Sequence, residues 1–396
     1  MKKITRTIWV LSLVSMFTDV ASEMLYPVMP VYLKSIGFSV VIIGMLEGLA
    51  EATAGLSKGY FGKMSDNMGR RVPFVRWGYL LSAVSKPMMA IFTFPLWIFS
   101  ARTLDRMGKG IRTGARDAIL SDEATPETKG AIFGFHRSAD TIGAVLGPSL
   151  ALAFLYFYPG HYKKLFYIAF LPGLIAISLT FLVKDKNPVP KENVKKTYFL
   201  DFIKYWKSSP VMYRKVVVGL LIFALFNSSD VFLLLKIKDA GYSDISTIGV
   251  YIFYNLIYAL FSYPLGIIAD RLGLKKIFLL GLLFFAVVYM GMAFNKNLYI
   301  FFALFFLYGI YAAATDGISK AWISNITDKK DTATAIGTFT GFQSICSLLA
   351  STGTGLLWSG FGAAGAFACT ATVTVVVFIY FLTIREPVSK YGSPQA

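Results

Sequence analysis

Seven charged side chains fall within sixteen residues of an otherwise apolar region of this sequence. They are Arg102, Asp105, Arg106, Lys109, Arg112, Arg116 and Asp117. On a helix these seven occupy an arc of roughly 140°. A charge near the centre of a bilayer costs about 2.5–3.5 kcal/mol, whereas an apolar residue gains only about 0.3–0.6 kcal/mol. This charged stripe must therefore face protein or a water-filled cavity, paired with acidic groups from elsewhere.

Acidic groups suited to this pairing, or to carrying protons, occur in the first two apolar segments. Asp19 and Glu23 share one face of the first segment, and Glu47 and Glu51 lie one turn apart in the second. Burial favours the protonated form of a carboxylate and a nearby guanidinium favours the ionised form, so their balance can make it responsive to a proton gradient. We expect these four acids and Arg106 to couple proton movement to function. A purely structural ion network is the alternative.

Composition identifies the elements that must position these groups. The 396-residue chain is 56% hydrophobic and 15% charged, where a soluble chain would carry about 25% charged residues. Runs of about 20 apolar residues recur, each long enough to cross roughly 30 Å of hydrocarbon. The sequence predicts an all-α polytopic membrane protein with twelve transmembrane helices. We place them at residues 7–33, 40–62, 72–94, 95–121, 130–157, 164–183, 213–237, 245–268, 275–294, 297–325, 332–358 and 362–384.

The net charge of +17 is distributed unevenly between the loops. Lys and Arg concentrate in alternate loops, which is the positive-inside pattern and places both termini in the cytoplasm, with the protein in the cytoplasmic (inner) membrane. This placement argues against nucleic acid as a partner. The first apolar run has no small-residue cleavage site, so we interpret it as a span and not as a cleaved signal. Cys346 and Cys369 lie in apolar segments, where packing roles are expected.

An internal repeat divides the chain. The segment Gly62–Arg71 recurs near Gly266–Lys276 at an offset of 204 residues, and an offset of 203 relates Gly114 to Gly317. Two six-helix halves related by a parallel repeat explain this register. We therefore expect an amino-terminal bundle at 1–183, a cytoplasmic linker at 184–212 and a carboxy-terminal bundle at 213–396. The linker contains Phe199, Phe202, Ile203 and Trp206 beside Lys204 and Lys207, which predicts a basic amphipathic helix on the membrane surface.

The repeated loop, with the pattern G-x-x-x-D-x-x-G followed by basic residues, resembles the signature loop of the major facilitator superfamily. The resemblance extends over the whole chain and implies that Asp66 bonds to the fourth or eleventh helix, with Arg112 or Arg116 as the expected partner. Such a contact would latch the outward-open state. The expected latch residues are Gly62, Asp66, Gly69, Arg70, Arg71, Arg112, Arg116, Asp270 and Arg271.

The resemblance also implies that helices one, four, seven and ten line a central cavity, and that Arg106 helps an acid to release its proton. The segment 226–230 interrupts an apolar run and predicts a local unwinding. The expected cavity residues are Asp19, Tyr26, Arg102, Arg106, Asn227, Asp230, Asn255, Tyr308 and Tyr311. Asp316 and Lys320, four residues apart, are expected to neutralise each other. His136 is expected at the cytoplasmic rim.

These features predict a secondary active transporter working by alternating access. We expect it to be proton-coupled and monomeric, without a cofactor or a bound metal, and to move a small anionic or zwitterionic solute because basic groups outnumber acids in the charged stripe. Gly143–Pro148 resembles the family's antiporter motif and favours efflux slightly. Export of drugs, or of a metal cation held by Asp19, Glu23 and Asn227, is the alternative within transport. A non-transporting membrane sensor is the alternative outside it, and no motif of an enzyme is present.

Overall fold

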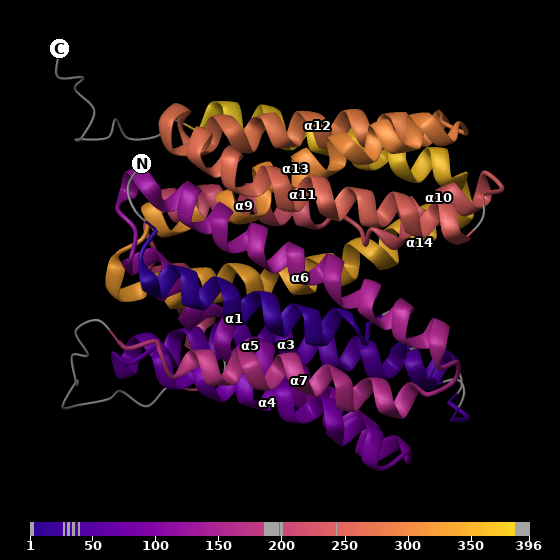
Figure 1. Ribbon diagram of the computed structural model, residues 1–396. Helices are drawn as coiled ribbons and strands as arrows, with labels where there is room; N and C mark the ends of the chain where they lie inside the picture. Colours follow the sequence, from indigo (N-terminus) through magenta and orange to yellow (C-terminus); the bar gives the residue numbers. More distant parts are fainter. Residues whose placement is uncertain are drawn as a thin grey trace.

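The computed structural model describes residues 4–185, 198 and 201–384, except 27, 30, 31, 34, 35, 39 and 243. It does not describe the side chains of residues 40–52, 201, 244, 245 and 248. All regular structure in the described part is helical, and it forms two bundles (Figure 1). The first contains α1 (Arg6–Glu23), α3 (Val40–Met68), α4 (Val72–Ile91), α5 (Pro95–Asp122), α6 (Lys129–Phe157) and α7 (Tyr162–Thr180). The second contains α9 (Val211–Ala224), α10 (Val231–Asp239), α11 (Asp244–Leu272), α12 (Leu274–Phe294), α13 (Leu298–Asn325) and α14 (Thr332–Thr383).

The predicted twelve-span fold is confirmed by this arrangement. The seventh span is divided between α9 and α10, so the predicted unwinding at 226–230 is correct. The long α14 holds the last two spans, which join at Gly362 with a φ of 71°. Six helical stretches of the described residues are long and apolar enough to cross a membrane. The charged α5 is not among them, and it depends on neighbouring helices to shield its charges from lipid.

The charged stripe is buried inside the first bundle. Arg102 and Asp105 are each only 4% exposed, and Lys86 of α4 is 1% exposed. Lys86 Nζ lies 2.6 Å from Asp105 Oδ1, and Arg102 Nη1 lies 3.5 Å from Asp105 Oδ2. Because buried charges are tolerated only when paired, these contacts fix the rotation of α5 against α4.

Both termini of the described chain lie at the same end of the molecule (Figure 1). We call this the linker end, because the chain leaves α7 there, where Asp185 accepts a hydrogen bond from the Arg71 amide at 2.9 Å. Tight turns at this end occupy equivalent places in the two halves: Gly69 between α3 and α4 has a φ of 63°, and Gly273 between α11 and α12 has a φ of 105°. Glycine adopts this left-handed conformation without the steric cost that a side chain would add.

The two bundles touch closely towards the linker end. A side-chain carbon built on Gly62 of α3 would lie 2.5 Å from the Ala333 carbonyl oxygen of α14. A carbon built on Gly134 of α6 would lie 2.3 Å from the Ser262 carbonyl oxygen of α11. No such approach surrounds Gly353 of α14. Glycines thus permit helix backbones of opposite bundles to meet, as in other close membrane-helix contacts.

The short helix α8 (Asp201–Ser208) joins this closed seam. Phe202 is 2% exposed and its ring fills the space beside Gly59 of α3, while its carbonyl accepts a hydrogen bond from Thr338 of α14 at 3.4 Å. The expectation that the apolar face of this helix rests on lipid is therefore wrong for Phe202, which is buried in protein, as is the neighbouring Tyr205. The helix contacts both bundles because the Phe202 ring fits the space left by Gly59. Residues 186–197, 199 and 200 of the linker lie outside the described residues, and the boundaries at 184 and 212 remain a proposal.

Candidate functional site

A cavity of about 400 Å³ lies between the two bundles. Its walls come from α1, α3, α5 and α6 on one side, and from α11, α13, α14 and the break between α9 and α10 on the other. The first, fourth, seventh and tenth spans therefore contribute, as expected. The second, fifth, eighth and eleventh spans contribute as well, because they meet at the seam between the bundles.

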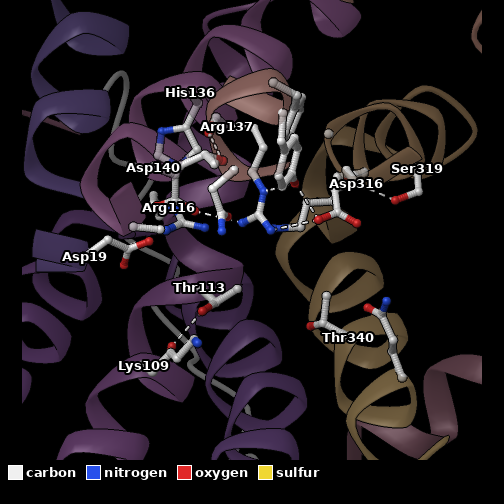
Figure 2. A pocket seen from close by; sticks show the side chains of 18 of the residues that line it. Asp19, Lys109, Thr113, Arg116, His136, Arg137, Asp140, Asp316, Ser319 and Thr340 are labelled. Carbon is white, nitrogen blue, oxygen red and sulfur yellow. Dashed lines mark hydrogen bonds and ion pairs between the residues drawn. The ribbon is translucent and has the colours of Figure 1, made fainter. Parts of the chain in front are cut away.

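Arg137 of α6 connects the bundles across this cavity. Its Nη2 lies 2.7 Å from Asp316 Oδ2 in α13, and its Nη1 lies 2.8 Å from Asp140 Oδ2 in its own helix. Tyr258 of α11 donates its hydroxyl to the same Asp316 oxygen at 2.5 Å. Figure 2 shows the guanidinium lying between the carboxylates of the two bundles. A single cation thus holds acids from both halves together.

Lys320 of α13 forms a second ion pair between the bundles. Its Nζ lies 2.7 Å from Asp117 Oδ2 in α5, and Arg116 Nη2 lies 2.9 Å from Asp117 Oδ1. The prediction that Asp316 and Lys320 neutralise each other is therefore wrong. Asp117 is fully buried, and an unpaired charge there would cost several kcal/mol, roughly 3–5. Pairing across the seam gives each of these charges a partner, whereas pairing within α13 would remove one of the two ion-pair partners of Asp117 and of Arg137.

Asp117 and Lys320 are also equivalent positions of the internal repeat. They lie 203 residues apart, the offset that relates Gly114 to Gly317. Gly317 in turn packs against α6, because a side-chain carbon built on it would lie 3.2 Å from the Phe133 carbonyl oxygen. Opposite charges at equivalent positions meet near the axis that relates two repeats, which explains this contact.

The α1 face of the cavity contains closely spaced acids. Asp19 of α1 and Asp140 of α6 both line this wall, so that two carboxylates from different helices face the same space. Asp140 also accepts from Ser15 at 2.5 Å, and Ser15 accepts from Arg116 at 3.1 Å. Gly143 makes the approach possible, because a side-chain carbon there would lie 3.0 Å from the Asp19 Cβ. This wall can therefore hold and release a proton beside fixed positive charges.

The opposite wall is aromatic and acidic. Asp230, in the break before α10, accepts a hydrogen bond from Tyr308 of α13 at 2.7 Å. Tyr251, Tyr254 and Asn255 of α11 line the cavity with it. Tyr254 packs against Tyr308 with ring centroids 5.0 Å apart. The cavity thus presents mixed charges on one side and a carboxylate with phenol rings on the other.

The linker end is closed by two equivalent carboxylates that accept backbone hydrogen bonds. Asp66 Oδ2 accepts from the Thr334 amide at 2.7 Å and the Thr334 hydroxyl at 2.8 Å. Asp270 accepts from the amides of Gly130 at 2.7 Å and Ala131 at 2.8 Å. Each acid therefore contacts the start of a helix in the other bundle, where unpaired amides favour an anion.

The partner predicted for Asp66 is wrong in one respect. Its contact to the eleventh span agrees with the implication of the signature loop, but Arg112 and Arg116 bind elsewhere. Arg112 donates to Ser82 at 2.6 Å and lies over the Tyr79 ring, and Arg116 binds Asp117. Arg71 supplies the basic partner at 3.3 Å. Asp66 lies beyond the predicted span 40–62. Burial raises the pKa of its carboxyl group to about 6, while the Arg71 guanidinium opposes this rise.

Comparison with known proteins decides the family. The family model described as Major Facilitator Superfamily matches residues 11–254 and 242–396, which is nearly the whole chain. The chain belongs to the major facilitator superfamily. It is thus a transporter of this membrane family and not an enzyme, and the resemblance of its signature loop is confirmed.

Relatives within the superfamily agree with this assignment. An uncharacterized MFS-type transporter of Methanocaldococcus jannaschii is 34% identical over 363 residues, covering 90% of this chain and 89% of that one. A multi-drug resistance efflux pump PmrA homolog of Lactococcus lactis is 23% identical, covering 79% and 78%. A solved structure of the E. coli fucose:proton symporter FucP matches with a TM-score of 0.76 at 12% identity, covering 95% and 97%. At that identity the structural match shows the fold alone.

Only some of the residues expected to couple proton movement to transport lie at the cavity. Asp19 and Glu23 both line the cavity. The side chains of Glu47 and Glu51 lie outside the described residues. Arg106 does not line the cavity, although it acts electrostatically on Glu23. The roles assigned to these residues remain predictions.

The expected cavity residues divide into two groups. Asp19, Asp230 and Asn255 line the cavity. The others lie outside its lining, and these are Tyr26, Arg102, Arg106, Asn227, Tyr308 and Tyr311. Tyr308 donates a hydrogen bond to Asp230 from outside the lining, and Asn227 donates to the Tyr311 hydroxyl at 3.0 Å. The hard-ligand metal trio considered for Asp19, Glu23 and Asn227 is therefore not assembled.

The predicted latch residues mostly gather at the linker end. Gly62, Asp66, Gly69, Arg71 and Asp270 occupy the turns and contacts given above. Arg70 and Arg271 are exposed beside them. Their function as a latch remains a proposal, although the contacts it requires are present.

Many residues line the cavity although the sequence did not predict them there, among them Lys109, Arg137, Asp140 and Tyr254. The expected place of His136 at the rim is wrong, because it is 4% exposed and lines the cavity. His136, Arg137 and Asp140 interrupt the apolar pattern at the start of the fifth span, much as the charged stripe interrupts the fourth. That interruption was the signal available in the sequence.

Proposed function

We propose that this superfamily member is a proton-coupled secondary transporter for a small solute with a negative charge or with both charges. The observation that carries the proposal is the set of ion pairs that joins the bundles beside the cavity. Opening the linker end requires Arg137 to leave Asp316 and Lys320 to leave Asp117. Solute or proton binding that offers these charges new partners would lower the cost of opening, which is the logic of alternating access.

Proton coupling in this proposal depends on Asp19 and its neighbours. Asp19 lines the cavity together with Asp140, and Asp140 in turn binds Arg137. Protonation of this acid pair would weaken its hold on Arg137 and so alter the contact with Asp316. The acid that titrates is thereby connected to the ion pair that joins the bundles.

The proposal also covers the direction of transport and the orientation of the protein in the membrane. A slight preference for efflux is supported by the multidrug efflux pump homologue of Lactococcus lactis and by the close packing of Gly143 and Gly147 on α1. The excess of Lys and Arg at the linker end supports a cytoplasmic location for that end and for both termini, in the cytoplasmic membrane. We propose a monomer, since the cavity is complete within one chain. Export of lipophilic drugs or of a metal cation is the second candidate, and it is favoured only by that homologue.

Flux in proteoliposomes tests this function. A pH-sensitive dye inside the vesicles should report solute-driven proton movement by the wild type. Asp19→Asn and Glu23→Gln should abolish the proton signal, whereas Lys390→Ala, near the chain terminus, should retain it. Binding without any flux would contradict transport and favour a sensor. Flux without proton movement in the wild type would contradict the coupling.

A further inference from the structure

The carboxy-terminal wall of the cavity contains a carboxylate that lacks a basic partner. Asp230 lies between α9 and α10, where the span is broken, and its Oδ1 accepts from Tyr308 at 2.7 Å. Within the described part of the chain no Lys, Arg or His forms an ion pair with it. Asp140 and Asp316, which also line the cavity, are both paired with Arg137, and the nearby Asp117 is paired with Arg116 and Lys320. Asp230 therefore offers a negative charge to whatever enters.

Aromatic rings surround this carboxylate. Tyr251 and Tyr254 follow one face of α11 and line the cavity beside Asp230. Their ring centroids are 6.0 Å apart, and Tyr254 packs at 5.0 Å against Tyr308, whose hydroxyl donates to Asp230. The face of an aromatic ring attracts a cation, and the attraction grows where water is excluded. One carboxylate bordered by phenol faces is the arrangement that recognises an organic ammonium group.

The chemistry of the wall distinguishes an ammonium group from a metal ion. Hard cations such as Ca²⁺ and Mg²⁺ require six or more oxygen ligands. In the described residues no group of three or more His, Cys, Asp and Glu has a metal-holding arrangement. The facing wall carries Lys109, an exposed cavity residue for which the described residues provide no ion pair. The acids of that wall share it with cations such as Lys109 and Arg116, whereas Asp230 forms no ion pair within the described residues, so Asp230 is the acid left for a positive group.

We propose that Asp230, Tyr251 and Tyr254 form a subsite for the protonated amine of the transported solute. The proposal rests on the proposed transport function and narrows it to zwitterionic solutes, with Asp230 receiving their ammonium group and Lys109 facing their negative end. Tyr308 is a positioning residue, because it orients the Asp230 carboxylate from behind.

Equilibrium binding to the purified full-length protein tests this subsite independently of flux. The probes are phenethylamine, which is protonated at pH 7, and 2-phenylethanol, its neutral counterpart of the same shape. We expect the amine to bind the wild type at least about tenfold more tightly than the alcohol, because only the amine gains a charge-assisted contact. Asp230→Asn should weaken amine binding at least about tenfold and leave the weak binding of the alcohol unchanged.

Matched variants separate this result from misfolding. Asp239→Asn makes the same change on an exposed acid of α10 and should leave amine binding unchanged. Tyr254→Phe keeps the ring face and should bind as the wild type does, whereas Tyr254→Leu should lose about threefold. Wild-type binding by Asp230→Asn, equal affinity for amine and alcohol, or no amine binding to folded wild type would each overturn the subsite. Loss of flux with retained amine selectivity would instead contradict only the transport proposal.

Discussion

Arg137 and Asp316 lie 2.7 Å apart although they belong to different bundles and are separated by 179 residues of sequence. Their side chains are 36% and 41% exposed, so water enters the contact. The same guanidinium binds Asp140 and lies 5.3 Å from the centre of the Tyr258 ring. The pair is therefore a junction between Asp140 in the first bundle and the α13 wall of the second.

Replacing Asp316 with Asn should open the linker end. The variant removes an ion pair of partial exposure, worth about 1–3 kcal/mol, and leaves Arg137 with the neutral Tyr258 as its contact in the other bundle. We expect a buried reporter, Ala333→Cys in a background lacking Cys346 and Cys369, to react with maleimide about tenfold faster. Asp328→Asn, an exposed acid beyond the seam, serves as the control. Equal labelling rates in the two variants would show that the junction does not hold the seam closed.

Adding a side chain to Gly134 should prevent closure at the linker end. The Cβ of Gly134→Ala would lie 2.3 Å from a backbone oxygen of α11, which cannot move without separating α6 from α11. We expect faster labelling at the same reporter and a loss of flux of about tenfold or more. Gly353→Ala meets no atom within 4 Å and should behave as the wild type. Normal flux by Gly134→Ala would mean that this contact is not formed during transport.

Truncating Asp66 to Ala should also favour the form that is open at the linker end. The change removes the acceptor for both the amide and the hydroxyl of Thr334, leaving buried donors unsatisfied at a cost of about 1–3 kcal/mol. Thr334→Ala removes only the hydroxyl and should open the seam less. Labelling of the reporter from the linker side measures both variants. An Asp66→Ala protein that labels as slowly as the wild type would contradict the latch.

Acidification should favour closure at the linker end through Asp66. Its pKa is about 6 in the closed form and falls towards the ordinary value of 3.8 once the carboxylate is hydrated. The closed form therefore binds the extra proton, and between pH 6 and 4 its population relative to the open form should rise by up to about tenfold per pH unit. Asp66→Asn retains a carbonyl acceptor but cannot titrate. The pH dependence that Asp66 contributes should therefore be absent from the labelling rates of this variant. An unchanged pH profile in the variant would exclude Asp66 as its source.

Much of the fold was determined by the sequence alone. Spans are long apolar runs and each must satisfy its own backbone within the membrane, so their number and helical nature follow from local composition. The loop that contains Asp66 recurs around Asp270, and this repeat in the sequence predicted two related halves. The cost of seven charges in lipid also required the stripe around Arg112 to face inwards, and it does.

Only the tertiary structure decided which charges meet. The rotation of α5, α6 and α13 about their axes depends on packing over the whole seam, including glycine contacts such as that of Gly134, and no local pattern specifies it. Consequently Lys320 pairs with Asp117 and not with Asp316 one turn away, and Asp66 binds Thr334 and not Arg112. An unpaired charge is costly when it is buried. Each buried charge therefore pairs with the partner that packing brings close in space, even where that partner is far away in the sequence.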